Sequence, residues 1–277
     1  MAASTSSTLA DLFANIIMQA RFTAEEQSLM AGLVTTYDIG NVAGKTIQVP
    51  KYPAVTAADL TEGTDMSSST VSTSGVTVTV AEVGAQVLLT DVAAMGAGNP
   101  AEELGTVLGN AIATKMDKDL IALFDGFSTS LGSAGTEITV EDLFKAEATL
   151  RNNKATGQIY AVLHPFHAHQ LSKNLTNTFA NPNGGDLQNE AMRNGFVGSI
   201  AGIEVYRSAN VTVDGSDDAK GCCFTSEAMC IAMKSDFNLE TQRDASLRAT
   251  ELNATAIYGV SELDDSFGVE MLFDAAL

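Results

Sequence analysis

The run MGAGNPAEEL contains the residues whose spacing comes closest to a known chemistry. Gly96, Gly98 and Ala101 lie between an expected strand and an expected helix, with Asp117 and Asp119 further along. A glycine-rich turn at a helix N-terminus, followed about twenty residues later by an acidic side chain, is the pattern of dinucleotide-binding sites. A nucleotide-dependent oxidoreductase is therefore one class to weigh.

The neighbours of these glycines argue against that chemistry. Pro100 removes an amide from the turn that would bind phosphate, and Glu102 and Glu103 place negative charge where the pyrophosphate would lie. We expect no cofactor-binding residue here, and the oxidoreductase remains an alternative only.

All the histidines lie in the run HPFHAH, as His164, His167 and His169. Neutral imidazoles so close in sequence suit a metal ion. However, residues 167 and 169 of a helix point about 200° apart, and no nearby cysteine or aspartate completes a ligand set. A strand end and a helix start with packed or exposed imidazoles are expected instead.

The run DGSDD imitates the opening of a calcium-binding loop. Asp214, Ser216 and Asp218 have the spacing of the first ligands, but Ala219 replaces the turn glycine and Thr225 the bidentate glutamate. We predict a solvated acidic turn without a metal.

Two remaining groups could act as nucleophile or as acid and base. Ser226 lacks the G-x-S-x-G context of an activated serine. Asp264 and Asp265 are adjacent, and neighbours on a strand point to opposite faces. No catalytic, cofactor-binding or metal-binding residue and no cofactor is predicted, and the chain is not expected to be an enzyme.

Composition indicates a folded, strongly acidic protein. The chain has 277 residues, 45% of them hydrophobic, enough for one large domain or two smaller ones. Fifteen basic against thirty-four acidic side chains give a net charge of -19. Such a surface repels phosphate, so direct nucleic-acid binding by its bulk is not expected.

The cysteines and the N-terminus indicate where the protein is made. Cys222, Cys223 and Cys230 lack metal-ligand spacing and suit buried, reduced thiols inside a cell. Asp11 interrupts the first apolar run, and no apolar run is long enough to span a membrane. Neither export nor membrane insertion is expected, which disfavours a secreted surface-array or adhesion protein.

The longest helical pattern runs from Asn99 to Asp125. Asn99 suits an N-cap and Pro100 the first helical position, and apolar residues then recur at three- and four-residue steps. This predicts one amphipathic helix of about 35–40 Å, named the spine helix, that spans an extended subunit.

The chain before the spine helix predicts two extensions. Residues 1–8 are small and polar, and residues 9–21 and 23–33 have helical apolar spacing, so these short helices need another surface, such as a neighbouring subunit. Residues 45–52 and 75–80 alternate like strands around a polar stretch. They predict a long hairpin that is marginal alone and needs a partner.

The rest of the chain mixes helices and strands. Thr139 and Asp142 form a capping-box pattern, and Pro165 opens a second helix. The expected elements are strand 85–92, turn 130–137, helix 139–153, strand 158–165, helix 165–175, a Gly/Asn-rich excursion 177–195, and strands 199–208, 223–233, 238–263 and 266–275. The last strands are expected to return toward the spine helix.

The order of these parts resembles the major capsid protein of tailed bacteriophages, the Hong Kong ninety-seven type fold, over essentially the whole chain. The matching stretches are GAQVLLTD before the capped spine helix, AVLHPFHAHQL, GSIAGIEVYRSANV, and FTSEAMCIAM followed by YGVSELDDSFGVEML. The resemblance implies an α+β fold with an N-terminal arm (1–44), an extended hairpin loop (45–85), a peripheral domain with the spine helix (86–134), an α/β axial domain (135–220) and peripheral-domain strands (221–277).

The resemblance also implies a function. The chain is expected to self-assemble as hexamers and pentamers into an icosahedral shell enclosing phage double-stranded DNA, without sequence-specific binding and without a membrane. The expected location is the virion, after synthesis and assembly in the host cytoplasm. Further expected partners are a separate scaffolding protein, because only 44 residues precede the hairpin, a portal and decoration proteins.

Two properties of related shells bear on this chain. One subfamily cross-links its subunits through a lysine of the extended loop, but Lys45 and Lys51 lie near the base of the hairpin, so this chemistry is not carried over. An encapsulin-like compartment that packages an enzyme has the same fold and remains an alternative.

Overall fold

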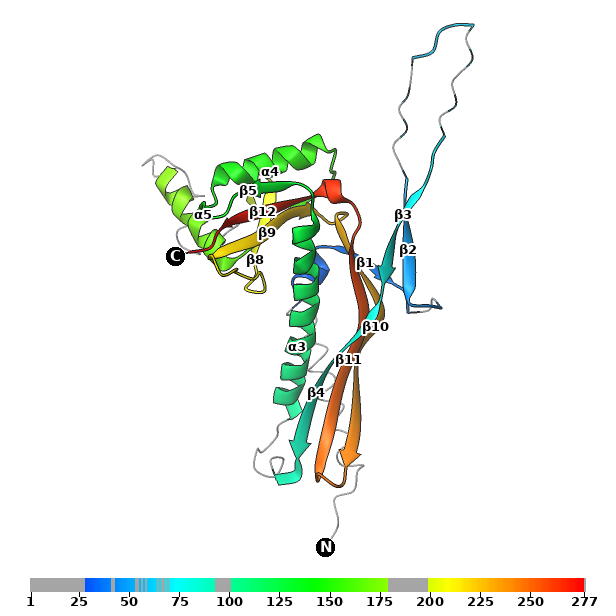
Figure 1. Ribbon diagram of the computed structural model, residues 1–277, viewed down its shortest axis with the longest axis vertical. Coiled ribbons are helices and arrows are strands. Elements are labelled where there is room, and N and C mark those ends of the chain that lie inside the picture. The colour runs from blue at the N-terminus through cyan, green and yellow to red at the C-terminus, as the bar shows by residue number, and fades with distance from the viewer. Residues whose placement is uncertain are drawn as a thin grey trace.

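The computed structural model describes residues 28–40, 43–52, 70–92, 101–178 and 199–276, together with residues 55, 57, 59–63, 65 and 68. Within these residues the chain forms a four-stranded sheet, a six-stranded sheet, a separate hairpin and three α-helices (Figure 1). This mixture confirms the α+β fold class.

The four-stranded sheet lies along the long helix α3 (Ala101–Ile121) (Figure 1). Its order is β1-β10-β11-β4, and only β1 and β10 are parallel. The strands are β1 (Thr35–Asp38), β4 (Ala81–Thr90), β10 (Met229–Asp244) and β11 (Ala249–Glu262). Alternate residues such as Val87 and Ala254 face the helix, so the period of two in the sequence builds this face.

Helix α3 confirms the spine helix from Ala101 onward. Its apolar side packs on the sheet through residues such as Leu108, Ile112 and Leu120, and its 21 residues span about 32 Å. The expected last turn tightens into a 3₁₀ helix, η2 (Ala122–Gly126). The proposed cap Asn99 and Pro100 lie outside the described residues.

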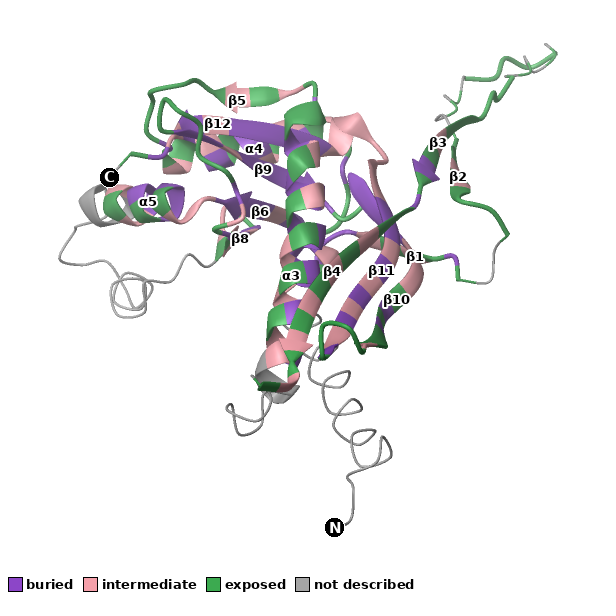
Figure 2. Ribbon diagram, turned by 60° about the horizontal axis from the view of Figure 1, so that its bottom comes forward, coloured by how far each residue is buried: buried purple, intermediate pink, exposed green. Residues whose placement is uncertain are grey.

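The predicted hairpin is formed by β2 (Thr46–Lys51) and β3 (Ser74–Thr79), with Lys51 opposite Ser74. It projects away from both sheets (Figures 1 and 2). Its base is packed more fully than expected, because Val78 and Val80 are buried against Cys230 and Ala232 of β10. Among the described residues of the hairpin, only the part beyond Lys51 is not packed against another element.

The six-stranded sheet has the order β5-β12-β9-β6-β8-β7. Its strands are β5 (Ser130–Gly132), β6 (Ile159–Leu163), β7 (Ser199–Ile200), β8 (Ile203–Arg207), β9 (Asp218–Thr225) and β12 (Gly268–Asp274). Helices α4 (Val140–Asn152) and α5 (Pro165–Thr178) contribute Leu143 and Leu171 to the core on one face. The predicted start of α4 is confirmed, since Asp142 Oδ2 accepts hydrogen bonds from Thr139 N at 3.0 Å and Thr139 Oγ1 at 2.7 Å.

The other face of this sheet packs on the end of the spine. Phe224 of β9 lies 5.9 Å from Phe124 of η2, measured between ring centroids. The adjacent residues Cys222 and Cys223 of β9 therefore belong to different cores, the first shared with α3 and the second with α4 and α5. The middle strand β9 thus joins the two halves of the subunit.

Residues 238–263, expected as one stretch of strand, form the end of β10 and the antiparallel β11, and the turn expected at 130–137 contains β5. Three further expected elements differ in the structure. Residues 199–208 form two strands joined by a turn at Ala201 and Gly202, whose φ angles are 55° and 74°. Residues 223–233 divide between β9 and β10, which lie in different sheets. Residues 28–33 contain only a 3₁₀ turn, η1 (Met30–Gly32), in place of the end of a helix, while residues 1–27 lie outside the described part.

The expected division of the chain into an arm, a hairpin loop, a peripheral domain and an axial domain remains a prediction. Strand β9 runs across the expected boundary between residues 220 and 221, and β12 lies in the same sheet as β6. Most of the excursion expected at residues 177–195 lies outside the described residues.

Candidate assembly surfaces

The dinucleotide pattern lacks its structural context. Gly96 and Gly98 lie outside the described residues, but β4, which precedes them, is antiparallel to β11 and not part of a parallel βαβ unit. Asp117 instead accepts a hydrogen bond from Met30 N at 3.1 Å, and Asp119 accepts one from Tyr258 Oη at 2.8 Å. Both acidic groups are used to hold the fold.

The histidines diverge as expected. His167 is buried and its Nε2 lies 3.2 Å from the carbonyl oxygen of Phe273, whereas His169 is exposed. His164 stacks edge-on with Phe166, with 4.8 Å between ring centroids. Burial lowers the pKa of His167. Among the described residues no group of three or more His, Cys, Asp or Glu side chains is arranged to hold a metal ion.

The acidic run at 214–218 forms a turn, but part of it is buried rather than solvated as expected. Asp214 Oδ1 accepts hydrogen bonds from Ser216 N at 2.8 Å and Asp218 N at 3.0 Å. Asp218 is buried, and its Oδ1 accepts a hydrogen bond from Gly135 N at 2.7 Å. The run therefore ties β9 to the turn before α4.

Asp264 and Asp265 lie on the link between β11 and β12 and not on a strand, which corrects the expectation. Asp265 is the first residue of the 3₁₀ turn η3 (Asp265–Phe267), and its Oδ1 accepts a hydrogen bond from Ser128 N at 2.7 Å. Asp264 caps that turn through Ser266 N at 3.1 Å. Ser226 is exposed, and its carbonyl oxygen accepts a hydrogen bond from Thr35 N at 3.1 Å.

The cysteines are buried free thiols, as predicted. Burial raises the pKa of Cys223 to about 12 and that of Cys230 to about 11, and it also raises the pKa of Cys222 well above its ordinary value. These thiols are not poised for nucleophilic chemistry.

The hairpin tip exposes several large apolar side chains. All described residues from 52 to 73 are exposed, including Tyr52 at 69% and Leu60 at 66%. Val55 and Val71 are exposed as well. Apolar side chains gathered on a projecting element mark a surface for contact with another protein.

Two contacts fix the base of this hairpin. Lys51 Nζ lies 2.6 Å from Asp264 Oδ2, which joins β2 to the β11–β12 link. Gly259 of β11 faces the end of β3 so closely that a Cβ there would lie 2.8 Å from the carbonyl carbon of Thr79. The hairpin is therefore held by its base while its tip stands free.

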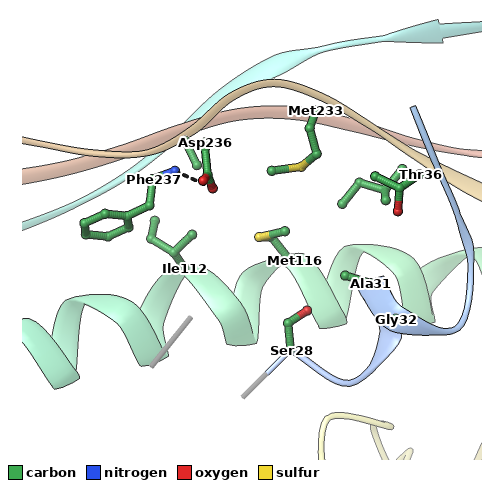
Figure 3. Close-up of a pocket in the computed structure, with 11 residues that line it drawn as sticks. Ser28, Ala31, Gly32, Thr36, Ile112, Met116, Met233, Asp236 and Phe237 are labelled. Carbon is green, nitrogen blue, oxygen red and sulfur yellow. Dashed lines mark hydrogen bonds between the residues drawn. The ribbon is translucent and has the colours of Figure 1, made fainter. Parts of the chain in front are cut away.

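A cavity lies between α3 and the four-stranded sheet, and the sequence did not predict it. It has a volume of about 340 Å³ and is lined by Met116, Met233 and Ser28 among others (Figure 3). One signal was present, since Asp117 stands within the apolar stripe of the spine helix. Its buried carboxylate holds the backbone of Leu29 and Met30 beside the cavity.

Among the described residues no helix is both long and apolar enough to cross a membrane.

Comparison with known proteins identifies the family. A sequence profile described as phage capsid protein matches residues 73–267. The comparison with curated proteins returned no match.

Solved structures show the same fold at low sequence identity. The capsid of the cyanophage P-SCSP1u is 18% identical, with 88% of this chain and 87% of that chain covered and a TM-score of 0.69. The capsid of the Helicobacter pylori bacteriophage KHP30 is 12% identical over 90% and 92% of the chains, with a TM-score of 0.70. A virus-like particle from Pyrococcus furiosus is 9% identical over 94% and 98%, with a TM-score of 0.63.

The family match spans most of the chain and is to phage capsid proteins, so it does not favour the encapsulin-like alternative. The strands and helices within residues 73–267 include the end of the hairpin, the spine helix and most of both sheets. The chain belongs to the phage capsid protein family and is a bacteriophage major capsid protein, a structural component of the icosahedral capsid of the virion.

Proposed function

We propose that the shell is held together by the hairpin, whose tip lies on a neighbouring copy of the chain. The observation that carries this is the contrast between the two ends of one element. The base is buried against β10, whereas Tyr52, Val55, Leu60 and Val71 at the tip are exposed. Association would remove this apolar surface from water, so the copies gain stability together that one copy lacks.

The copies assemble as hexamers and pentamers that close into the icosahedral shell. In this proposal residues 135–220, with α4, α5 and the strands β6 to β8, form the axial domain near the ring centres. Residues 86–134 with the spine helix and residues 221–277 form the peripheral domain. The elongated shape of the subunit, with a compact part at one end and a long sheet at the other, supports this division (Figure 1).

The enclosed cargo is double-stranded phage DNA, contained without sequence-specific binding. A net charge of -19 per chain repels phosphate, so the wall confines DNA without adhering to it. The protein acts through burial and shape and not as an enzyme. A scaffolding protein, a portal and decoration proteins remain predicted partners, and assembly is predicted in the host cytoplasm.

The test is to shorten the hairpin while keeping its base. Residues 53–72 are replaced by Asn-Gly, a pair that closes a two-residue hairpin turn between β2 and β3. A second variant keeps the full length and replaces Tyr52, Val55, Leu60 and Val71 by Ser. Sedimentation and electron microscopy are expected to show folded subunits without closed shells for the first variant and fewer shells for the second. Normal shells from the shortened chain would refute the role of the hairpin.

A further inference from the structure

The cavity beside α3 lies between this helix and strand β10 of the four-stranded sheet. Ile112 and Met116 of α3 form one wall, and Ile231 and Met233 of β10 form the other. Met116 and Met233 point toward each other across the space (Figure 3). Protein interiors are close-packed, so an apolar space of this size within a helix–sheet contact indicates a missing side of the core.

The volume of the cavity limits which side chains can occupy it. Its volume is about 340 Å³. An apolar cavity of about 150 Å³ accommodates a benzene ring. The space beside α3 is therefore large enough for two side chains of the size of phenylalanine and isoleucine.

The first described residues of the chain, Ser28 to Met30, lie beside the cavity. Ser28 lines the cavity, and its Oγ donates a hydrogen bond to Asp117 Oδ1 at 3.2 Å. Asp117 also accepts hydrogen bonds from the backbone of Leu29 and Met30, so the chain is fixed where it arrives at α3. Ser28 is therefore the point at which the preceding 27 residues join the chain at the cavity.

Those residues carry an apolar stripe of matching size. Its members stand at steps of three and four, the spacing of one helix face: Leu9, Leu12, Phe13, Ile16 and Ile17. Asp11 and Asn15 fall between them on other faces.

We propose that this stripe, within residues 9–21 of the same chain, occupies the cavity, with Phe13 and Ile17 filling the space between Met116 and Met233. Eleven positions separate Ile17 from Ser28, a tether of at most about 40 Å. A short tether gives an effective concentration in the millimolar range, which favours the arm of the same chain over that of another copy. The arm then completes the core of its own subunit, in contrast to the hairpin, which needs a neighbour.

The direct test is a disulfide between arm and cavity. Ile17→Cys is combined with Met233→Cys in the full chain, and with Val107→Cys as the control, because Val107 is 56% exposed on α3 and does not line the cavity. The native thiols are buried and do not compete. After mild oxidation of dilute subunits, a link within one chain is expected for Met233→Cys only. A link between chains, equal linking in the control, or no link in folded protein would overturn the proposal.

A second measurement does not depend on new cysteines. Phe13→Asp with Ile17→Asp is compared with Asp11→Asn, which changes another face of the same segment. Release of the stripe is expected to speed peroxide oxidation of Met116 and Met233 by about tenfold or more, while Met271, buried in the other core, stays protected. Unchanged oxidation of Met116 and Met233 would overturn the proposal, whatever happens to shell formation.

Discussion

Lys51 Nζ and Asp264 Oδ2 lie 2.6 Å apart, so the outer end of β2 is tied to the link between the two sheets. Asp264 Oδ1 at the same time accepts hydrogen bonds from Ser266 N at 3.1 Å and Ser266 Oγ at 2.6 Å. The two oxygens have different tasks, one holding the hairpin and the other capping η3. The angle of the hairpin is thus set by an ion pair as well as by its apolar base.

Replacing Asp264 by Asn should free the hairpin without unfolding the subunit. Asn keeps an oxygen for Ser266 but loses the charge that holds Lys51. Because half-exposed ion pairs contribute about 0–1 kcal/mol, the free energy of unfolding should change by less than about 1 kcal/mol. Hydrogen exchange of residues 46–51 should nevertheless become faster.

The control for that variant is Lys45→Gln, at the other end of β2, where no ion pair is found within the described part of the chain. It should leave hydrogen exchange of the hairpin unchanged. If Asp264→Asn has no more effect than Lys45→Gln, the ion pair does not restrain the hairpin.

Asp117 predicts a pH dependence of stability. Burial raises its pKa, outweighing hydrogen bonds from Met30, Leu29 and Ser28 that lower it. The folded state therefore takes up the proton more readily than the unfolded state. The contribution of this group to stability is most favourable below its unfolded pKa of about 3.9 and decreases as pH rises toward the folded pKa.

The measurement is urea unfolding of the wild type and of Asp117→Asn at about pH 4 and about pH 7. Relative to the variant, which cannot titrate, the wild type should lose stability between the lower and the higher pH. A constant difference, or a wild type that gains stability as the pH rises, would contradict this assignment.

Gly259 is predicted to be irreplaceable where the end of β3 crosses β11. A Cβ at this position would lie 2.8 Å from the carbonyl carbon of Thr79, and backbone cannot move aside as a flexible side chain can. Gly259→Ala should destabilise the subunit by about 1–3 kcal/mol, as overpacked cores do. Gly215→Ala is the matched control, because no atom lies within 4 Å of its Cβ. Equal stabilities of the two variants would show that the contact is relaxed.

The three cysteine thiols should not react with maleimides in the native protein. Burial raises the pKa of Cys223 to about 12 and that of Cys230 to about 11, and only thiolates react quickly with maleimides. Labelling near neutral pH should therefore be negligible until denaturant is added, when all three residues should react. Rapid labelling of any one of them in folded subunits would contradict their burial.

Periodicity made the main elements predictable from sequence. The spine helix follows a continuous pattern of three and four, and the hairpin follows clear alternation, so both were located within a few residues. The turn at Ala201 and Gly202 was missed because Ala is an unusual residue at a positive φ angle. The 3₁₀ turn at Met30 was missed because it is held by Asp117, 87 residues away.

The assembly surfaces were only partly predictable. The polar stretch of the hairpin indicated that its tip needs a partner. The burial of Val78 and Val80 at the base of the hairpin was not predicted, because it depends on packing against distant strands. The cavity at Met116 and Met233 and the pair of Lys51 and Asp264 are products of tertiary packing, which no local pattern records.

Whether a neighbouring copy covers the hairpin tip can be measured by hydrogen exchange of residues 52–73 in free subunits and in assembled shells, with the buried strand β9 as reference. Rapid exchange is expected in free subunits and strong protection in shells, because the tip is covered only by a neighbouring copy. Equal exchange in the two states, whether fast or slow, would contradict it.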